Sequence, residues 1–334
     1  MGINDGGSEV PNIPKRQSAY LDFLQEPSSS PRRQRRGLYR SLTFGSGAKS
    51  VRVILLDTRT FRDRHVIPSV GAVARGIPVI GKLTPLAAAF SRWAANMLGW
   101  TATHQGDMLG EEQWTWLEAQ LKAGSELEEN KRDPPAFTIL VSSVQVLTTA
   151  PVFESWGHFP VAKAKLLALL QRYKPRGLLL LSGDVHFAEL AVYPPLSQDS
   201  TRSTTGEESS AVDCGSSVAE VTSSGLTHTC LSHAAGFLTQ LTCRPVLAYY
   251  TAHRPDPESY YATAPNFGML EIDWEAVGGP LLKATVEPTD PEKRGNKPAL
   301  VLTRRSCPLN LPFTIERTGD GAGLEMRGAK SVEF

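Results

Sequence analysis

The chain has 334 residues, of which 41% are hydrophobic and 21% are charged. This balance excludes disordered and fibrous proteins and is typical of a globular chain with one large domain or two small ones. The formal net charge of +1 produces no strong field toward nucleic acid or an anionic membrane. An anionic ligand must therefore be recognised locally.

The four cysteines are scattered along the chain and form no Cys-x-x-Cys pair. A zinc ribbon and a disulfide framework are therefore not indicated, and one or two disulfides remain open. The first twenty residues are polar and show no signal peptide. No run of about 18 apolar residues exists, so we expect no membrane span. The compartment stays undetermined.

Residues 1–50 are polar and rich in turn-forming residues, with a short helix expected only from Tyr20 to Leu24. The arginine-rich run from Arg32 to Arg36 suits nucleic-acid binding or targeting. Interleaved prolines and serines favour a solvated surface loop instead, and neither an aromatic platform nor a second basic stretch accompanies the run. We therefore expect no nucleic-acid binding.

A series of strands and helices follows in the next part of the chain. Apolar and β-branched runs predict strands over residues 50–57, 136–143 and 177–186. Helical spacing and helix-start signals predict helices over residues 86–98, 110–121 and 160–173. The leucine run after Gly177 is typical of a strand buried on both faces. Strand and helix alternate with short connections, which predicts a layered α/β domain.

The pattern changes after Leu190. Residues 197–217 are rich in Ser, Thr and Gly and predict a loop. Two later runs, residues 266–274 and 281–286, predict a hairpin joined by a turn at Gly278 and Gly279. The second half therefore adds strands, which fits a sheet-on-sheet core flanked by helices.

The most informative candidate site is Ser182-Gly183-Asp184-Val185-His186, at the end of the leucine-rich strand. Side chains alternate along a strand, so we expect Asp184 and His186 to project to the same side. A carboxylate and an imidazole placed in this way are natural ligands for a divalent or trivalent metal ion. Spacing alone equally fits a strand-terminal Asp beside a hydrogen-bonded, half-buried His.

A second candidate follows the first strand, where Asp57 and Arg59 stand two residues apart. Asp57 can orient a neighbouring group, and the planar guanidinium of Arg59 can bind a phosphate through two parallel hydrogen bonds. A structural Asp–Arg pair that ties the loop is the commoner use of such residues.

Two weaker candidates lie in loops. The stretch from Glu154 to Pro160 includes Trp156 and His158, which either face a substrate or begin a helix through aromatic packing. The stretch from Thr222 to His228 combines several hydroxyls with an imidazole, which suits a site loop or an ordinary Ser/Thr turn.

Taken in order, these stretches resemble the successive blocks of the PhoD-like alkaline phosphatases, a family of metallophosphatases. No single block is specific, but the ordered set is. The set corresponds to the C-terminal two-thirds of a family domain. The blocks are residues 53–63, 109–118, 141–145, 154–156, 181–189, 222–228 and 266–268.

The resemblance implies a four-layer αββα metallophosphatase sandwich that hydrolyses phosphate monoesters or diesters. It implies more than one metal ion, with calcium and iron as the candidates, and a water molecule activated by two metals. Asp184 and His186 match the family's metal-binding motif, and His186 is also an implied catalytic residue. Arg59 and Trp156 would help to place the phosphate ester.

The chain departs from the family at its N-terminal side. Family members carry acidic motifs with further metal ligands and then an Asp-Asp-His-Asp-Tyr-Gly-x-Asn-Asp-like block. The opening from Met1 to Asp5 is similar to the tail of that block, which makes Asn4 an expected metal ligand. We therefore expect an N-terminally truncated domain over residues 1–290, with an open sheet edge, and a C-terminal extension over residues 291–334.

Two functions fit these observations. The chain is either a phosphohydrolase whose sequence is incomplete and lacks the upstream metal ligands, or a catalytically inactive fragment or pseudoenzyme that binds or regulates. A third function, RNA binding through the arginine run, predicts a steep dependence on salt. An almost neutral chain gives little basis for it.

Overall fold

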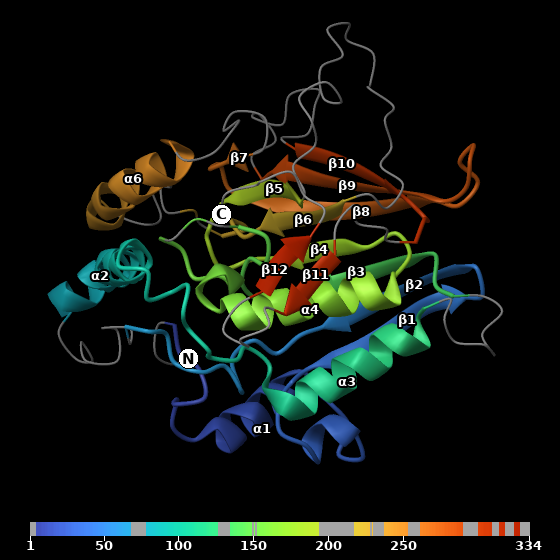
Figure 1. Cartoon of the computed structure of the whole chain (residues 1–334), viewed down its shortest axis with the longest axis horizontal. Coiled ribbons are helices and arrows are strands. Elements are labelled where there is room, and N and C mark those ends of the chain that lie inside the picture. The colour runs from blue at the N-terminus through green and yellow to red at the C-terminus, as the bar shows by residue number, and fades with distance from the viewer. Residues whose placement is uncertain are drawn as a thin grey trace, which may run out of the picture.

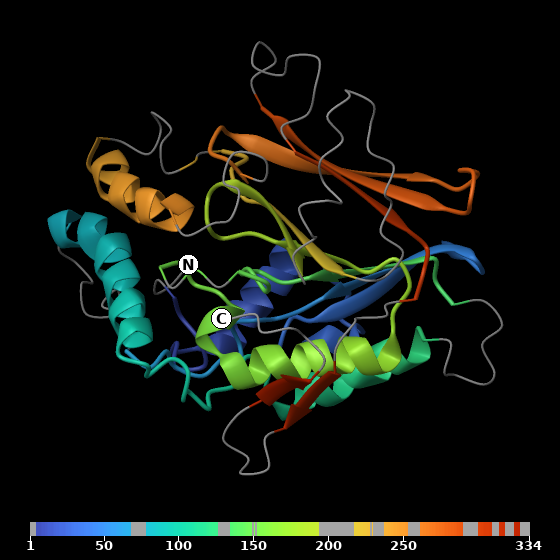
Figure 2. The same ribbon diagram turned by 45° about the horizontal axis from the view of Figure 1, so that its top comes forward.

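The chain folds around a large mixed sheet that has helices on one face and a smaller sheet on the other (Figures 1 and 2). A computed structural model describes residues 5–67, 78–125, 134–148, 150, 152–193, 217–227, 229, 237–252, 261–289, 300–308, 314–317 and 324–327. The mixed α/β fold predicted from the sequence is thereby confirmed.

The large sheet contains seven described strands: β1 Arg40–Ser46, β2 Lys49–Leu55, β3 Phe137–Val141, β4 Leu179–Ser182, β5 Ala188–Tyr193, β6 Val218–Ser223 and β7 Tyr261–Ala262. Their order is β1-β2-β3-β4-β6-β5-β7. β2, β3, β4 and β6 run parallel, and β1, β5 and β7 pair antiparallel toward the two margins. The carboxyl ends of the parallel strands therefore meet at one edge, where open α/β sheets bind ligands.

The three strands predicted in the first half are confirmed as β2, β3 and β4. β3 is buried at four of its five positions, as expected for a central strand covered on both faces. β4 ends at Ser182 rather than at His186, the predicted end. The extended backbone stops there because Asp184 and His186 adopt positive φ angles of 78° and 58°.

Helices α3 (Gly110–Ala123) and α4 (Pro160–Tyr173) cover one face of the large sheet (Figure 2). Both were predicted with nearly these bounds. Their buried apolar side chains share one core with β2, β3 and β4; among them are Trp114, Leu117, Leu121, Leu166 and Leu170. Each fully buried leucine of this kind contributes about 1.5–3 kcal/mol through its removal from water.

A three-stranded antiparallel sheet covers the other face, in the order β10-β9-β8. Its strands are β8 Asn266–Asp273, β9 Leu281–Pro288 and β10 Leu300–Arg305. The predicted hairpin is confirmed as β8 and β9, with Gly278 and Gly279 at φ angles of 86° and 102° in the turn. β10 comes from the segment expected to form an extension, and it pairs with β9 along its whole length.

The described elements thus form three layers: helices α3 and α4, the large sheet and the three-stranded sheet. The two sheets share a second apolar core, in which β3, β4 and β6 contribute from one side and β9 from the other. The C-terminal strands β11 (Thr314–Arg317) and β12 (Leu324–Arg327) form a separate ribbon, and β11 lies against α4. Cys307 is disulfide-bonded.

Helices α2 (Pro78–Met97) and α6 (Phe237–Ala252) pack together at one side of the sheets (Figure 1). α2 begins at Pro78, before the predicted start at residue 86. The two helices share an apolar cluster with Val152, Val185 and Phe187 from the loops after β3 and β4. They therefore cover these loops. Among the described residues, no helix has the length and apolarity needed to cross a bilayer.

The N-terminal segment is more ordered than the sequence predicted. It contains helix α1 (Ile13–Phe23), the short 3-10 helix η1 (Pro31–Arg33) and β1, a margin strand that was not predicted. The arginine run is partly exposed, as predicted, but it forms η1 and a turn whose arginine side chains contact the fold. Arg32 and Arg33 form ion pairs with Glu26 and Asp22, and Arg35 and Arg36 lie over the rings of Tyr39 and Phe61.

Candidate functional site

The loops that follow β2, β3 and β4 meet at the carboxyl edge of the large sheet. The first carries Arg59, the second Glu154 and the third Asp184, and ion pairs join all three side chains. Parallel strands place these segments side by side although they are far apart in the sequence. This cluster is the candidate site.

Asp57 builds the turn that carries Arg59. Its carboxylate accepts hydrogen bonds from the backbone N–H groups of Arg59 at 3.0 Å and Thr60 at 2.9 Å, and from the hydroxyl of Thr60 at 2.6 Å. It also accepts one from the backbone N–H of Leu38 at 2.8 Å. Asp57 is therefore the orienting group proposed from the sequence, and it acts on the backbone of the turn.

Gln113, on α3, binds the backbone of the same turn. It was not predicted from the sequence. Its amide oxygen accepts the backbone N–H of Asp57, and its amide nitrogen donates to the carbonyl of Asp57, both at 2.8 Å. Gln113 is fully buried, so these backbone groups are satisfied without water. The only sequence signal was its place in the block from Leu109 to Glu118.

Glu154 is the buried centre of the cluster. Its side chain is 2% exposed, and its Oε1 atom lies 2.5 Å from Nη1 of Arg59. Nε of Arg62 and Nε2 of His65 each lie 3.5 Å from the same oxygen. Within the described residues, the other carboxylate oxygen, Oε2, has no hydrogen-bond partner. No separate role for Glu154 was predicted from the sequence.

The charge of Glu154 is stabilised by its neighbours. Burial alone would raise the pKa of this carboxyl, but the hydrogen bond from His65 and the charges of Arg59 and Arg62 outweigh burial and hold the pKa well below its usual range. Burial lowers the pKa of His65, so His65 contacts Glu154 as a neutral imidazole. The carboxylate is thus ionised and paired mainly with Arg59.

Asp184 lies on the solvent side of Arg59. Its Oδ1 atom is 3.4 Å from Nη2 of Arg59, and 39% of its side chain is exposed. Crowding by surrounding protein atoms, and then the charge of Glu154, raise the pKa of Asp184 to about 6, although Arg59 opposes this shift. Asp5 acts in the same direction as Glu154. Two carboxylates, Glu154 and Asp184, therefore flank one half-exposed guanidinium.

Asp184 and His186 follow the strand instead of forming its end. Strand alternation therefore does not decide where their side chains point, and that argument from the sequence was wrong. Both have positive φ angles, unusual for residues other than glycine, whereas Gly183, the residue expected to supply this freedom, does not. The backbone N–H of His186 donates to the hydroxyl of Ser224 at 3.3 Å. The side chain of His186 is exposed. Strain of this kind is concentrated at functional sites.

Trp156 and His158 are buried rather than open to a ligand. They form the short 3-10 helix η3 (Trp156–His158), in which Trp156 is 0% exposed and its indole N–H donates to Ser142 at 3.0 Å. The Nε2–H group of His158 donates to the carbonyl of Phe153 at 2.8 Å. These contacts fix the loop on which Glu154 stands.

The N-terminal end of the described chain reaches the same cluster. Asp5 accepts from Nη1 of Arg92, on α2, at 2.5 Å, and its carbonyl accepts from Arg62. Asn4, the expected ligand beside it, lies outside the described residues, as does His228. Arg62, His65 and Arg92 are site neighbours that the sequence analysis did not identify.

The donors for a metal ion are incomplete in this structure. Asp184 and His186 supply a carboxylate and an imidazole, which suit several metals. Calcium takes about six to eight oxygen ligands, however. No group of three or more His, Cys, Asp or Glu side chains in the described ranges is arranged to hold a metal ion. Each carboxylate of the cluster also faces an arginine, so the described residues do not fit a complete metal centre.

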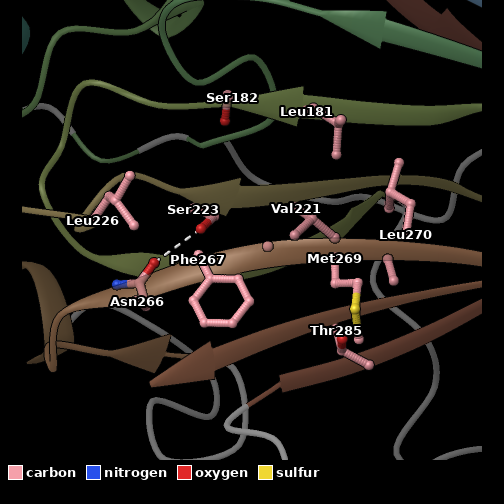
Figure 3. Close-up of a pocket in the computed structure, with 12 residues that line it drawn as sticks. Leu181, Ser182, Val221, Ser223, Leu226, Asn266, Phe267, Met269, Leu270 and Thr285 are labelled. Carbon is pink, nitrogen blue, oxygen red and sulfur yellow. Dashed lines mark hydrogen bonds between the residues drawn. The ribbon is translucent and has the colours of Figure 1, made fainter. Parts of the chain in front are cut away.

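A cavity of about 330 Å³ lies between the two sheets, beside the end of β4 (Figure 3). Its walls are mainly apolar, and Leu181, Val221 and Leu270 are among them. At its polar end Ser223 donates to Asn266 at 2.9 Å, the dashed contact in Figure 3. Neither Arg59 nor Asp184 lines this cavity, so it is distinct from the charged cluster.

Comparisons with known proteins place the chain in context. A model of the PhoD-like phosphatase family matches residues 13–279, most of the chain. A solved structure described as "Structure of PhoD" aligns with a TM-score of 0.43 and 16% sequence identity, a likeness too low to support an argument about fold or function. That alignment covers 99% of this chain and 53% of the other, so this chain spans about half of that protein. No curated protein matches the chain.

Proposed function

The chain belongs to the PhoD-like phosphatase family, and from this membership we propose that it hydrolyses phosphoric esters, monoesters or diesters, at the carboxyl edge of the large sheet. One observation carries the placement. Arg59 is 35% exposed and stands between the buried Glu154 and the exposed Asp184 at the strand ends. A guanidinium held in this way is suited to bind a phosphate through two parallel hydrogen bonds.

The residues have separate roles in this proposal. Arg59 binds the phosphoryl oxygens, and Asp57 and Gln113 fix the turn that carries it. Asp184 and His186 are metal ligands, and His186 also borders the reacting group. Because Trp156 is fully buried, we propose that it acts indirectly, by anchoring the loop of Glu154.

We also propose that the reaction depends on metal ions, with calcium and iron implied by the family resemblance and Asn4 as a further ligand. Such ions, when bound, supply positive charge at the phosphoryl oxygens and lower the pKa of a bound water molecule. The described residues supply only two of the donors, Asp184 and His186.

The architecture proposed for a complete domain is the four-layer αββα sandwich, with a second helical layer over the three-stranded sheet. Exposed apolar side chains on that sheet support a covering layer, because Met269 and Val301 both lie opposite Thr285 of β9 and so share one face. Within this scheme residues 1–290 belong to the phosphatase domain and residues 291–334 extend it.

The test is hydrolysis of a chromogenic phosphate monoester and diester, with calcium and iron supplied and again with a chelator. We expect metal-dependent turnover that Asp184→Asn and His186→Gln abolish. Arg59→Met should lower kcat/KM about 100-fold, as expected when one donor to a developing oxyanion is lost. Arg172→Met, which removes an exposed arginine paired with Glu118, is the control and should retain activity.

A second candidate function is phosphate binding without hydrolysis. The half-exposed guanidinium of Arg59, held between Glu154 and Asp184, supports it, because an arginine can bind phosphate without a metal ion. A folded chain that binds inorganic phosphate through Arg59 but turns over neither ester, with any metal supplied, would replace the hydrolase proposal by this one.

A further inference from the structure

Glu154 links the candidate phosphate-binding arginine to the buried interior of the protein. We propose that Glu154 is a positioning residue that holds the guanidinium of Arg59 in the orientation needed to bind phosphate. This inference rests on the proposed function of the site, because it concerns how the same arginine meets its ligand.

The two carboxylates fix different ends of the guanidinium. Nη1 of Arg59 lies 2.5 Å from Oε1 of Glu154, and Nη2 lies 3.4 Å from Oδ1 of Asp184. A guanidinium is planar, so a short contact at one nitrogen limits the directions in which its remaining N–H groups point. The shorter contact is the one to Glu154, which therefore sets the orientation.

Burial separates the roles of the two carboxylates. The side chain of Glu154 is 2% exposed, against 39% for Asp184 and 35% for Arg59. A phosphate in solution can reach Arg59 but not Glu154. Glu154 therefore acts through Arg59 and does not contact the ligand.

The backbone beside Glu154 is hydrogen-bonded to a second segment of the loop, which gives a positioning residue the support it requires. Ser155 forms a parallel β-bridge with Gln145, and the N–H of Trp156 donates to the carbonyl of Gln145 at 2.9 Å. Trp156, two residues after Glu154, is fully buried, and its indole packs in the core. Arg59 is thus attached to a fixed point in the second loop.

Glu154 also compensates buried positive charge. Arg62 is 0% exposed, and its Nε atom lies 3.5 Å from Oε1 of Glu154. Among the described residues, this is the ion pair that Arg62 forms. Removing the charge of Glu154 therefore also lowers stability, because Arg62 is left without that compensation. A test must separate the loss of fold from the loss of orientation.

The experiment compares Glu154→Gln and Glu154→Asp with the control Glu26→Gln. Glu26 is a largely buried carboxylate that pairs with Arg32 and Arg40 away from the site, so its replacement imposes a similar loss of an ion pair. For each protein, urea unfolding gives stability, calorimetry gives the Kd for inorganic phosphate, and hydrolysis of a chromogenic phosphate ester gives kcat and KM.

We expect Glu154→Gln to raise both KM and the Kd for phosphate by roughly tenfold, the lower end of effects seen when outer-shell partners of functional groups are removed. Glu154→Asp keeps the charge but shortens the side chain by one methylene. It should therefore fold even if the Gln variant does not, and it should raise KM and the Kd for phosphate by an intermediate amount. Glu26→Gln should lose stability and keep both constants unchanged.

The inference is overturned if the folded Glu154 variants lose stability but retain the wild-type KM and phosphate Kd, since Glu154 would then be structural only. A wild-type chain that neither binds phosphate nor hydrolyses esters overturns the proposed function as well. An active wild-type chain with unaffected Glu154 variants overturns the positioning role alone, so the two failures are distinguished.

Discussion

Acid is expected to destabilise this fold through His158, whose imidazole is buried in the loop beside α4. The side chain is 5% exposed, and its Nε2 atom must carry the hydrogen because the carbonyl of Phe153, 2.8 Å away, can only accept. Burial, and then the neighbouring His65 ring and the charge of Arg92, lower the pKa of His158 from 6.5 to about 3. The folded chain therefore holds this imidazole neutral throughout mildly acidic conditions.

The sign and size of the effect follow from linkage. The unfolded chain takes up a proton on this group near pH 6.5, and the folded chain does so only near pH 3. Between these values the unfolded state binds more protons, so the free energy of unfolding falls as pH falls. At about 1.36 kcal/mol per pKa unit, the full contribution is about 5 kcal/mol, of which about 2 kcal/mol is lost between pH 7.5 and pH 5.

The assay is urea unfolding of the wild type and His158→Gln, followed by tryptophan fluorescence at pH 5.0, 6.0 and 7.5. Glutamine retains an N–H donor for Phe153 but does not titrate. We expect the variant to be less stable at pH 7.5 and the difference in unfolding free energy to shrink by about 2 kcal/mol at pH 5. Parallel stability curves for the two proteins would refute the buried, neutral imidazole.

Three further predictions concern stability. Burial lowers the pKa of Lys163 from 10.5 to about 8. As pH rises, the folded chain therefore loses this proton before the unfolded chain does. The free energy of unfolding should rise between pH 8 and 10.5 by up to about 3 kcal/mol. Urea titrations should show this rise in the wild type and not in Lys163→Met. Gly177→Ala should lower the thermal midpoint by the equivalent of about 1–3 kcal/mol, because φ is +49° and the added Cβ would lie 2.8 Å from the carbonyl of Ala136. Gly99→Ala, with positive φ but open space, should lower it less. Leu166→Ala should cost about 2–5 kcal/mol in urea unfolding, because Leu166 is 0% exposed; a loss below 1 kcal/mol would contradict its place in the core.

The elements that the sequence predicted are those with a strong local pattern. β3 and β4 are continuous apolar runs, and α3 and α4 have apolar residues at helical spacing with clear starts. β1 was missed because it is a margin strand whose last four side chains are exposed, which removes the alternation. α6 was missed because it contains Pro245, a residue that normally ends helices.

β6 shows a different limit of sequence analysis. It contains Glu220, which is 1% exposed and would normally argue against a buried strand. The carboxylate is satisfied because it accepts the backbone N–H groups of Val146 at 2.8 Å and Leu147 at 2.7 Å. These partners lie more than seventy residues away in the sequence, so no local pattern predicts the contacts.

The candidate site was predicted only in part for the same reason. Arg59 and Asp184 stand at strand ends, where a sequence pattern indicates a site even before the fold is known. Glu154 is 95 residues from Arg59 in the chain, and its role depends on a side-chain contact between two loops. The positive φ of Asp184 was equally hidden, because a glycine stands beside it.

The contacts around Arg59 also indicate which one yields when an anion binds as proposed. The contact with Glu154 is 2.5 Å long and buried, and breaking it would leave a charge without compensation inside the protein. The contact with Asp184 is 3.4 Å long and exposed, and water can replace it at little cost. A phosphate on Arg59 would therefore displace Asp184 and leave Glu154 in place. Under the proposed role of Asp184 as a metal ligand, that exchange would free its carboxylate for the metal ion, so binding of the anion and binding of the metal would favour each other.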